Sequence, residues 1–301
     1  MIIVRFKGGL GNQMFQYAMY IALKNLYPDT PIIVDCLAYK TQKMHNGFEL
    51  PSIYNVALTN YFFTGNSRYA PYGRYFYTFL IKAIRTYFTR QQTYLSDEIE
   101  LKEDPLHLDP SKNYYFDGHW GSENYFTGYR EQLLKAFTFR QTQLPSDMLV
   151  IKNIAASSDS VSIHIRRTDY LTPGSGFRDL TEGNYYPAAM AYIKERTVNP
   201  VFYIFSDDIH WCKKNLPYFD HSEHYYLSGN QGENAYKDIH LMSLCRHNII
   251  ANSTFSWWGG WLNNHPDKIV LCPNDLFHDS KKNERVIRAF YPNDWIKVKS
   301  I

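Results

Sequence analysis

The sequence predicts an α/β protein with two Rossmann-like domains that face each other across a cleft. Three observations support this prediction. The chain has 301 residues, whereas a single hydrophobic core usually stops growing at about 250 residues. It opens with a strand, a glycine loop, a helix and a second strand, and strands alternate regularly with helices after residue 160. Such alternation implies right-handed crossovers and a parallel sheet.

The N-terminal domain is expected over residues 1–158 and begins with a βαβ unit. Apolar residues recur at helical spacing from 13 to 26, and Pro28 and Asp29 end this helix. An insertion of loops and helices is expected from about 36 to 110. The predicted elements are strand 2–6, glycine loop 8–12, helix 13–26, strand 31–35, a strand that enters a loop at 114–120, and helix 122–137.

The C-terminal domain, expected over residues 159–301, follows the polar stretch 155–160. Short apolar runs alternate here with longer segments of helical periodicity. The predicted strands are 161–165, 201–205, 224–227, 248–251 and 268–271, and the predicted helices are 185–196, 209–216, 235–246 and 254–263.

The composition excludes several classes of protein. A formal charge of +3, from 32 basic and 29 acidic residues, is too small for a nucleic-acid-binding surface. A hydrophobic fraction of 45% excludes a disordered chain. The four cysteines form no C-x-x-C pair, so neither a zinc site nor a disulfide framework is expected.

Targeting signals are not evident in the sequence. The N-terminus lacks the basic and apolar regions of a secretory signal, and no apolar run reaches the roughly 18 residues that a bilayer requires. A cytoplasmic protein is therefore expected. The aromatic stretch 75–84, which contains Lys82, is ordinarily interpreted as a core helix, and its alternative is a peripheral contact with the inner face of the membrane.

Polar residues collect where the C-terminal strands end, which is where open parallel sheets bind ligands. His164 and Arg166 share one face of strand 161–165, and Arg167 follows. Two arginines at a strand end can bind phosphate as a fork, although surface salt bridging is the ordinary role of such a pair. His164 is a base, a phosphate donor or a buried structural histidine.

A second anion site is predicted before helix 254–263. Ser253 is a candidate N-cap, and the amides after it face outward at the positive end of the helix dipole, unless Ser253 only caps the helix. This turn and the arginines could hold a pyrophosphate without a metal. No metal is expected, because Asp207 and Asp208 lack D-x-D spacing. The tryptophans at 257, 258 and 261 are expected in the core.

The glycine loop has a competing interpretation. Gly9 and Gly11 begin the dinucleotide fingerprint G-x-G-x-x-G, and Asp35 stands where a ribose-binding acid would. Met14 replaces the third glycine and would obstruct close packing of the helix on the strand. Asn12 is expected at the tip of the loop, either pointing into the cleft or as an ordinary turn residue. An NAD-dependent oxidoreductase is therefore the alternative.

Four segments together resemble the bacterial α-1,2-fucosyltransferases, glycosyltransferase family 11. They are GGLGNQMFQYA at 8–18, HIRRTDY at 164–170, FSDD at 205–208 and NSTFSWWG at 252–259. The H-x-R-R-x-D element is shared with α-1,6- and protein O-fucosyltransferases. The first and last segments narrow the resemblance to the α-1,2 type.

The resemblance implies a GT-B fold, GDP-β-L-fucose as donor, no metal or other cofactor, and inverting transfer to the 2-hydroxyl of a terminal β-galactoside. Lactose or N-acetyllactosamine types of acceptor are expected, lipid-linked in O-antigen biosynthesis. By position, Arg166 would bind the β-phosphate with support from His164 and Arg167. Asp169 is the candidate base, or a structural acid that fixes an arginine. The other implied donor-binding residues are Gly11, Asn12, Asp207, Ser253, Thr254 and Phe255.

Two other classes of protein would show different binding behaviour. An oxidoreductase would bind NADH, and its activity would not depend on Arg166. A sugar-binding protein without catalysis, which 26 Tyr and 19 Phe residues permit, would bind galactosides whether or not GDP is present.

Overall fold

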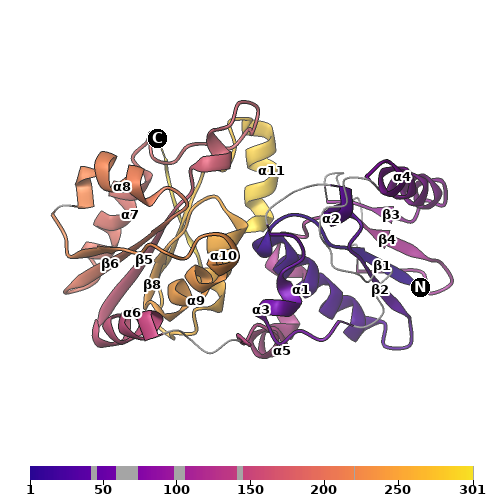
Figure 1. Ribbon diagram of the computed structural model, residues 1–301, viewed down its shortest axis with the longest axis horizontal. Helices are drawn as coiled ribbons and strands as arrows, with labels where there is room; N and C mark the ends of the chain where they lie inside the picture. Colours follow the sequence, from indigo (N-terminus) through magenta and orange to yellow (C-terminus); the bar gives the residue numbers. More distant parts are fainter. Residues whose placement is uncertain (42–45, 59–73, 98–105, 141–144, 220, 301) are drawn as a thin grey trace. The chain divides into compact units, whose positions relative to one another are not determined.

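The computed structural model describes residues 1–41, 46–58, 74–97, 106–140, 145–219 and 221–300. The chain divides into two compact units, Met1–Gln141 (unit 1) and Thr142–Ile301 (unit 2), which Figure 1 shows in sequence colours. The predicted boundary after residue 158 differs from this division. Helix α6 (Pro145–Ala156) packs against α9 (Tyr236–Leu244), so the chain enters unit 2 before α6 rather than after it.

Unit 1 contains a parallel sheet in the order β2-β1-β4-β3. The predicted first strand and the strand after it pair in register, from Ile2 opposite Ile32 to Arg5 opposite Asp35. The strands are β1 (Ile2–Arg5), β2 (Ile32–Asp35), β3 (Tyr94–Leu95) and β4 (Tyr114–Phe116). The helices are α1 (Leu10–Leu26), α2 (Ala38–Thr41), α3 (Leu50–Ile53), α4 (Arg74–Arg90) and α5 (Arg130–Ala136).

Helix α1 begins earlier than predicted. The extended residue Gly9 is its N-cap, and the Gly9 carbonyl accepts from the amides of Asn12 and Gln13, both at 3.0 Å. Gly11 and Asn12 therefore lie in the first helical turn, and the prediction that Asn12 stands at a loop tip is wrong. The predicted helix 122–137 is also corrected: two 3-10 turns, Glu123–Tyr125 and Thr127–Tyr129, precede α5.

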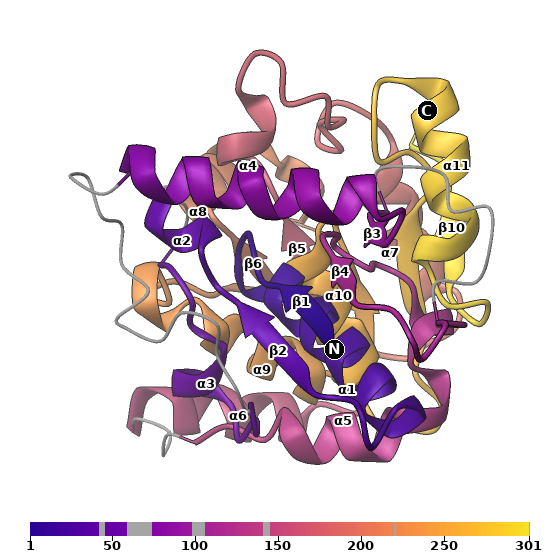
Figure 2. The ribbon, with the colours of Figure 1, turned by 90° about the vertical axis from the view of Figure 1, so that its right-hand side faces the viewer.

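Residues 75–84 form the first part of α4 and are not a core helix. Tyr75, Phe76 and Phe79 are 86%, 64% and 69% exposed, and Figure 2 shows α4 along the outside of unit 1. Only one face of α4 packs on the sheet, with Phe88 buried against Tyr115. Among the described residues, no helix has the length and apolar character needed to cross a membrane.

Unit 2 contains a parallel sheet in the order β10-β9-β8-β5-β6-β7. Its strands are β5 (Asp159–Ile165), β6 (Pro200–Ser206), β7 (His224–Tyr226), β8 (His247–Ile249), β9 (Val270–Pro273) and β10 (Ile296–Val298). Its remaining helices are α7 (Tyr185–Lys194), α8 (Ile209–Asn215), α10 (Thr254–Leu262) and α11 (Ser280–Phe290). Helices α6 and α11 and strand β10 are not among the predicted elements.

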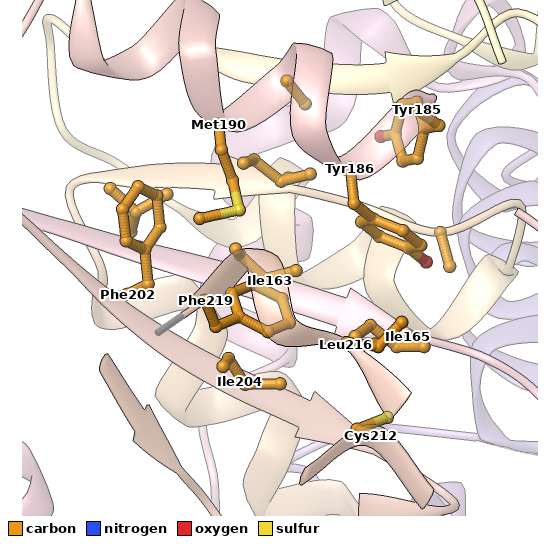
Figure 3. Close-up of a cluster of buried hydrophobic side chains, with 14 of the residues drawn as sticks. Ile163, Ile165, Tyr185, Tyr186, Met190, Phe202, Ile204, Cys212, Leu216 and Phe219 are labelled. Atoms are coloured by element: carbon orange, nitrogen blue, oxygen red, sulfur yellow. The ribbon is translucent and has the colours of Figure 1, made fainter. Parts of the chain in front are cut away.

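The core of unit 2 forms where one face of β5 meets α7. Val161, Ile163 and Ile165 alternate along β5 and are fully buried. Figure 3 shows Tyr186 and Met190 of α7 among the side chains that surround this strand. The three tryptophans of α10 are also buried, which confirms their prediction as core residues. All four cysteines are buried and free.

Candidate active site

The order of strands in unit 2 defines where a ligand would bind. Chain order runs outward from β5 through β6 and β7 on one side, and through β8, β9 and β10 on the other. The connections therefore reverse direction between β5 and β8, and ligands of open parallel sheets bind at such a switch point, beyond the carboxyl ends of the strands. The predicted residues after β5, β6 and β8 all lie at this edge.

Arg166, directly after β5, presents a charged and partly accessible guanidinium. Its side chain is 24% exposed, and it pairs with Asp169 (Nη2 to Oδ1, 2.7 Å) and Asp207 (Nη1 to Oδ2, 3.3 Å). Burial alone would lower the pKa of Arg166, but Asp207 and Asp169 outweigh it and raise the pKa above its usual value. The guanidinium has five N–H donors, so two ion pairs leave donors for an anion.

Asp207 holds the loop that carries Arg166. One carboxylate oxygen accepts from the Arg167 amide at 2.9 Å, and the other accepts from the Thr168 amide and hydroxyl at 3.1 and 2.5 Å. By the family resemblance, Asp207 is expected to bind the nucleotide. The structure places its carboxylate against the protein's own loop, where it orients residues 166–168.

Arg167 has partners that differ from those of Arg166. Its side chain is 9% exposed, donates to Thr181 at 2.9 Å and pairs with Asp179 at 3.3 Å. Its guanidinium carbon lies 3.2 Å from the centre of the Trp211 ring. Arg166 is therefore partly exposed at the edge of the sheet, whereas the Arg167 side chain is held by protein partners. The binding of phosphate by both arginines as a fork stays a prediction.

His164 is buried beside Arg166 and is 4% exposed. Its ring lies 5.7 Å from that of Phe255, centre to centre. Burial lowers the pKa of His164 to about 4, and the positive charge of Arg166 adds to this effect. The imidazole is therefore neutral at neutral pH. Its Nδ1 makes no hydrogen bond among the described residues.

The N-terminus of α10 completes this edge. Ser253 is the N-cap, as predicted, and its hydroxyl accepts from the Phe255 amide at 3.3 Å. Asn252 fixes the preceding turn by donating to the carbonyls of Arg178 and Leu276, both at 3.0 Å. The first-turn amides and the dipole of α10 therefore form a positive helix end next to β5.

Tyr170, which is not among the predicted site residues, connects the Arg166 loop to the N-terminus of α10. Its hydroxyl donates to the Asn252 carbonyl at 3.0 Å, and the guanidinium carbon of Arg166 lies 5.7 Å from its ring centre. The ring stacks on Phe177 at 4.0 Å. Its place in the segment HIRRTDY was the signal that could have identified it.

In unit 1, Gly11 and Asn12 lie at the carboxyl edge of the other sheet. Gly8 adopts a φ of +80°, and a Cβ there would collide with the Asn12 side chain. Two buried glutamines fix this turn: Gln13 donates to the carbonyls of Gly8 and Gly47, and Gln16 to those of Lys7 and Gly118. Neither glutamine is among the residues predicted from the sequence to belong to the site.

The environment of Asp35 argues against the alternative of an NAD-dependent oxidoreductase. This residue is 1% exposed, and its carboxylate accepts from the Leu37 amide at 2.7 Å and from the Tyr115 hydroxyl. Burial raises the pKa of Asp35. An acid enclosed in this way cannot receive a ribose, and Met14 is fully buried where the fingerprint needs glycine.

No group of three or more His, Cys, Asp or Glu residues among those the structure describes could hold a metal ion. The positive charge at the switch point comes from Arg166 and the end of α10. Such a site can bind a diphosphate and stabilise it as it leaves.

Two fucosyltransferases are among the solved structures with a similar fold. NodZ from Bradyrhizobium superposes with a TM-score of 0.51 over 86% of this chain and 91% of its own, at 13% identity. A variant of Arabidopsis thaliana FUT1 in complex with GDP superposes with a TM-score of 0.53. The match covers 89% of this chain and 69% of FUT1, at 11% sequence identity. These likenesses concern the fold alone, and they confirm the GT-B class expected from the sequence.

Sequence comparison then gives the family. The family model described as Glycosyl transferase family 11 matches residues 81–299. The chain belongs to glycosyl transferase family 11. It is 32% identical to the Escherichia coli alpha-1,2-colitosyltransferase, over 99% of this chain and 98% of the relative. It is 29% identical to the Escherichia coli O-antigen biosynthesis glycosyltransferase WbnK, over 97% of this chain and 98% of WbnK. It is 27% identical to the mouse galactoside 2-alpha-L-fucosyltransferase Sec1, over 99% and 74%.

Proposed function

We propose that this glycosyltransferase moves L-fucose from GDP-β-L-fucose to the 2-hydroxyl of a terminal β-galactoside, with inversion and without a metal. The observation that carries the proposal is Arg166 at the switch point. Two carboxylates keep it charged and oriented, and Tyr170 links it to the positive end of α10. The similarity to an alpha-1,2-colitosyltransferase and to a galactoside 2-alpha-L-fucosyltransferase supports this linkage and acceptor.

The reaction exchanges one bond at the anomeric carbon of the sugar. The bond from C1 to the β-phosphate oxygen breaks, and its electron pair leaves with GDP. The acceptor 2-hydroxyl forms the new bond from the opposite face and loses its proton. Negative charge grows on the departing phosphate, so fixed positive charge there lowers the barrier.

The residues divide into binding and positioning groups. Arg166 binds the β-phosphate, and Ser253, Thr254 and Phe255 present the α10 amides to the pyrophosphate. Asp207 and Arg167 position the Arg166 loop through the contacts described above. Gly11 and Asn12 lie in the turn that Gln13 and Gln16 fix. Their proposed role is to bind the donor at its fucose and pyrophosphate groups.

The proton acceptor remains a separate proposal. Asp169 is half-exposed, but its carboxylate pairs with Arg166 at 2.7 Å, which favours an orienting role over that of a base. Neutral His164 can accept a proton, but it is buried. The variant Asp169→Asn distinguishes the two roles of Asp169. Loss of an orienting acid weakens GDP binding, whereas loss of a base lowers kcat and leaves GDP binding intact.

Colitosyl transfer is the second candidate function, favoured by the relative at 32% identity. Colitose is L-fucose without its 3-hydroxyl, so both donors would offer the same diphosphate to Arg166. The two candidates therefore differ only in the pocket for the sugar.

The deciding experiment incubates the protein with lactose and either GDP-fucose or GDP-colitose, and determines the product linkage by NMR. An α-1,2-linked fucosyl trisaccharide from GDP-fucose establishes donor, linkage and stereochemistry together. If product forms only from GDP-colitose, the transferred sugar is colitose and not fucose. Galactose linked β-1,3 to N-acetylhexosamine serves as a second acceptor. If folded protein gives neither product nor donor hydrolysis with either acceptor, the proposal fails.

A further inference from the structure

Helix α4 carries two apolar stripes, whereas packing on the sheet requires only one. The inner stripe includes Ile84 and Phe88, which pack against Ile3 and Tyr115 in unit 1. The outer stripe consists of Phe76, Phe79, Ala83 and Tyr87, spaced three or four residues apart, with Tyr75 beside it. Its aromatic side chains are 55–86% exposed. An exposed, mainly aromatic stripe of this kind marks an interaction surface.

The charges of α4 are of one sign. Its sequence holds Arg74, Lys82, Arg85 and Arg90 and no acidic residue. Arg85 turns back over the Tyr94 ring of the sheet, at 5.2 Å. Lys82 and Arg90 are exposed beside the outer aromatic stripe. The outer face of α4 therefore combines aromatic rings with positive charge.

We infer that the outer face of α4 binds an anionic lipid surface. Helices that lie in the membrane interface have this composition: aromatic side chains enter the boundary between headgroups and acyl chains, and Lys and Arg attract anionic headgroups. Seventeen residues span about 25 Å at 1.5 Å per residue, and the cations prevent insertion across the bilayer. The helix lies in the plane of the surface and holds unit 1 there.

A second copy of the chain fits this face less well. A homodimer would bring the cations of two helices together, with no acidic residue on α4 to pair with them. The lipid surface supplies both the apolar layer and the negative charge. This inference does not depend on the proposed donor or acceptor, because it concerns the outside of unit 1 alone.

The test is flotation of the full-length protein with vesicles of phosphatidylcholine, with and without an equal part of phosphatidylglycerol. The wild type is expected to float with the anionic vesicles at low salt and to be released from them as salt increases. Phe76→Ser/Phe79→Ser should lose binding at any salt. Lys82→Glu/Arg90→Glu should weaken binding to anionic vesicles by about thirtyfold or more, at about 1 kcal/mol per cation near the surface.

Matched controls separate this effect from general changes of surface. Val198→Ser removes an apolar side chain that is 86% exposed in unit 2, and Lys194→Glu/Lys214→Glu reverses two exposed charges there. Both should bind vesicles like the wild type. Circular dichroism should show all variants folded, since the changed side chains are exposed.

Three results would overturn the inference. The first is a wild type that does not float with anionic vesicles. The second is unchanged binding by the Phe76→Ser/Phe79→Ser variant. The third is self-association in sedimentation velocity that this variant abolishes, without any vesicle binding, which would assign the face to a second copy.

Discussion

At the scale of single residues, two adjacent arginines have different tasks. Arg166 is partly exposed between Asp169 and Asp207, and Arg167 is buried against Trp211, Thr181 and Asp179. The same side chain therefore has the proposed role of charge stabilisation at position 166 and holds the protein's own scaffold at position 167. The different partners of the two guanidinium groups produce this division.

Substitution of the two arginines should separate catalysis from stability. Arg166→Ala should lower kcat by about a hundredfold or more, as expected for the loss of a fixed charge at the leaving group, and should change the unfolding free energy by less than about 1 kcal/mol. Arg167→Ala should cost about 3 kcal/mol of unfolding free energy, because it leaves buried partners uncompensated. Urea unfolding measures the free energy of unfolding of each variant, and steady-state kinetics measures its kcat. A folded Arg166→Ala protein with normal turnover would contradict the proposed role.

The buried His164 makes stability depend on pH. Its pKa is about 4 when folded, against a usual value of about 6.5. Below pH 6.5 the unfolded chain binds a proton that the folded chain excludes, so stability falls as the pH drops from 6.5 to 4, and this group adds no further loss below 4. The full loss is about 3 kcal/mol. His164→Phe should flatten the unfolding free energy over this window, and an unchanged slope would argue against a neutral His164.

At the scale of elements, the N-terminus of α10 combines a structural cap with a proposed binding role. Ser253→Ala should lower the unfolding free energy by about 1 kcal/mol and also weaken GDP binding. Asp279→Ala is the matched control, because Asp279 caps α11 by accepting from the Lys282 amide at 2.9 Å. It should cost similar stability and leave GDP affinity unchanged in calorimetry. Equal GDP affinity in both variants would limit Ser253 to capping.

The elements also show where sequence patterns succeed. Strongly periodic segments such as β5, α7 and α10 are predicted to within about two residues. Helix α11 was missed because it is mostly polar and exposed, with Phe290 its one buried residue. Helix α1 starts early because Gly9, in an extended conformation, caps it without a side chain. The Asp279 N-cap of α11 is visible in the sequence, whereas the backbone cap at Gly9 leaves no residue preference to read.

At the scale of the whole molecule, the proposed function assigns the positive charge that meets GDP to Arg166 and the N-terminus of α10, and no group of three or more His, Cys, Asp or Glu residues in the described part of the chain could hold a metal ion. Transfer from the GDP-sugar should therefore proceed at the same rate in excess EDTA as with added Mg²⁺ or Mn²⁺. The assay is initial rate of product formation at saturating donor. Loss of activity in EDTA that a divalent cation restores would show that Arg166 and α10 do not suffice.

The sequence by itself determined the α/β class, the order of most strands and helices, and the segments that carry the site. Those features follow from local periodicity and from residue types that each position reports independently. Only the tertiary structure decided which side chains are available. Arg167, Asp207 and Asp35 are polar residues at strand ends, and each is committed to partners that lie at least 12 positions away. Burial and partner choice depend on neighbouring strands, because the order of strands in the sheet brings distant segments together, and no local pattern contains that order.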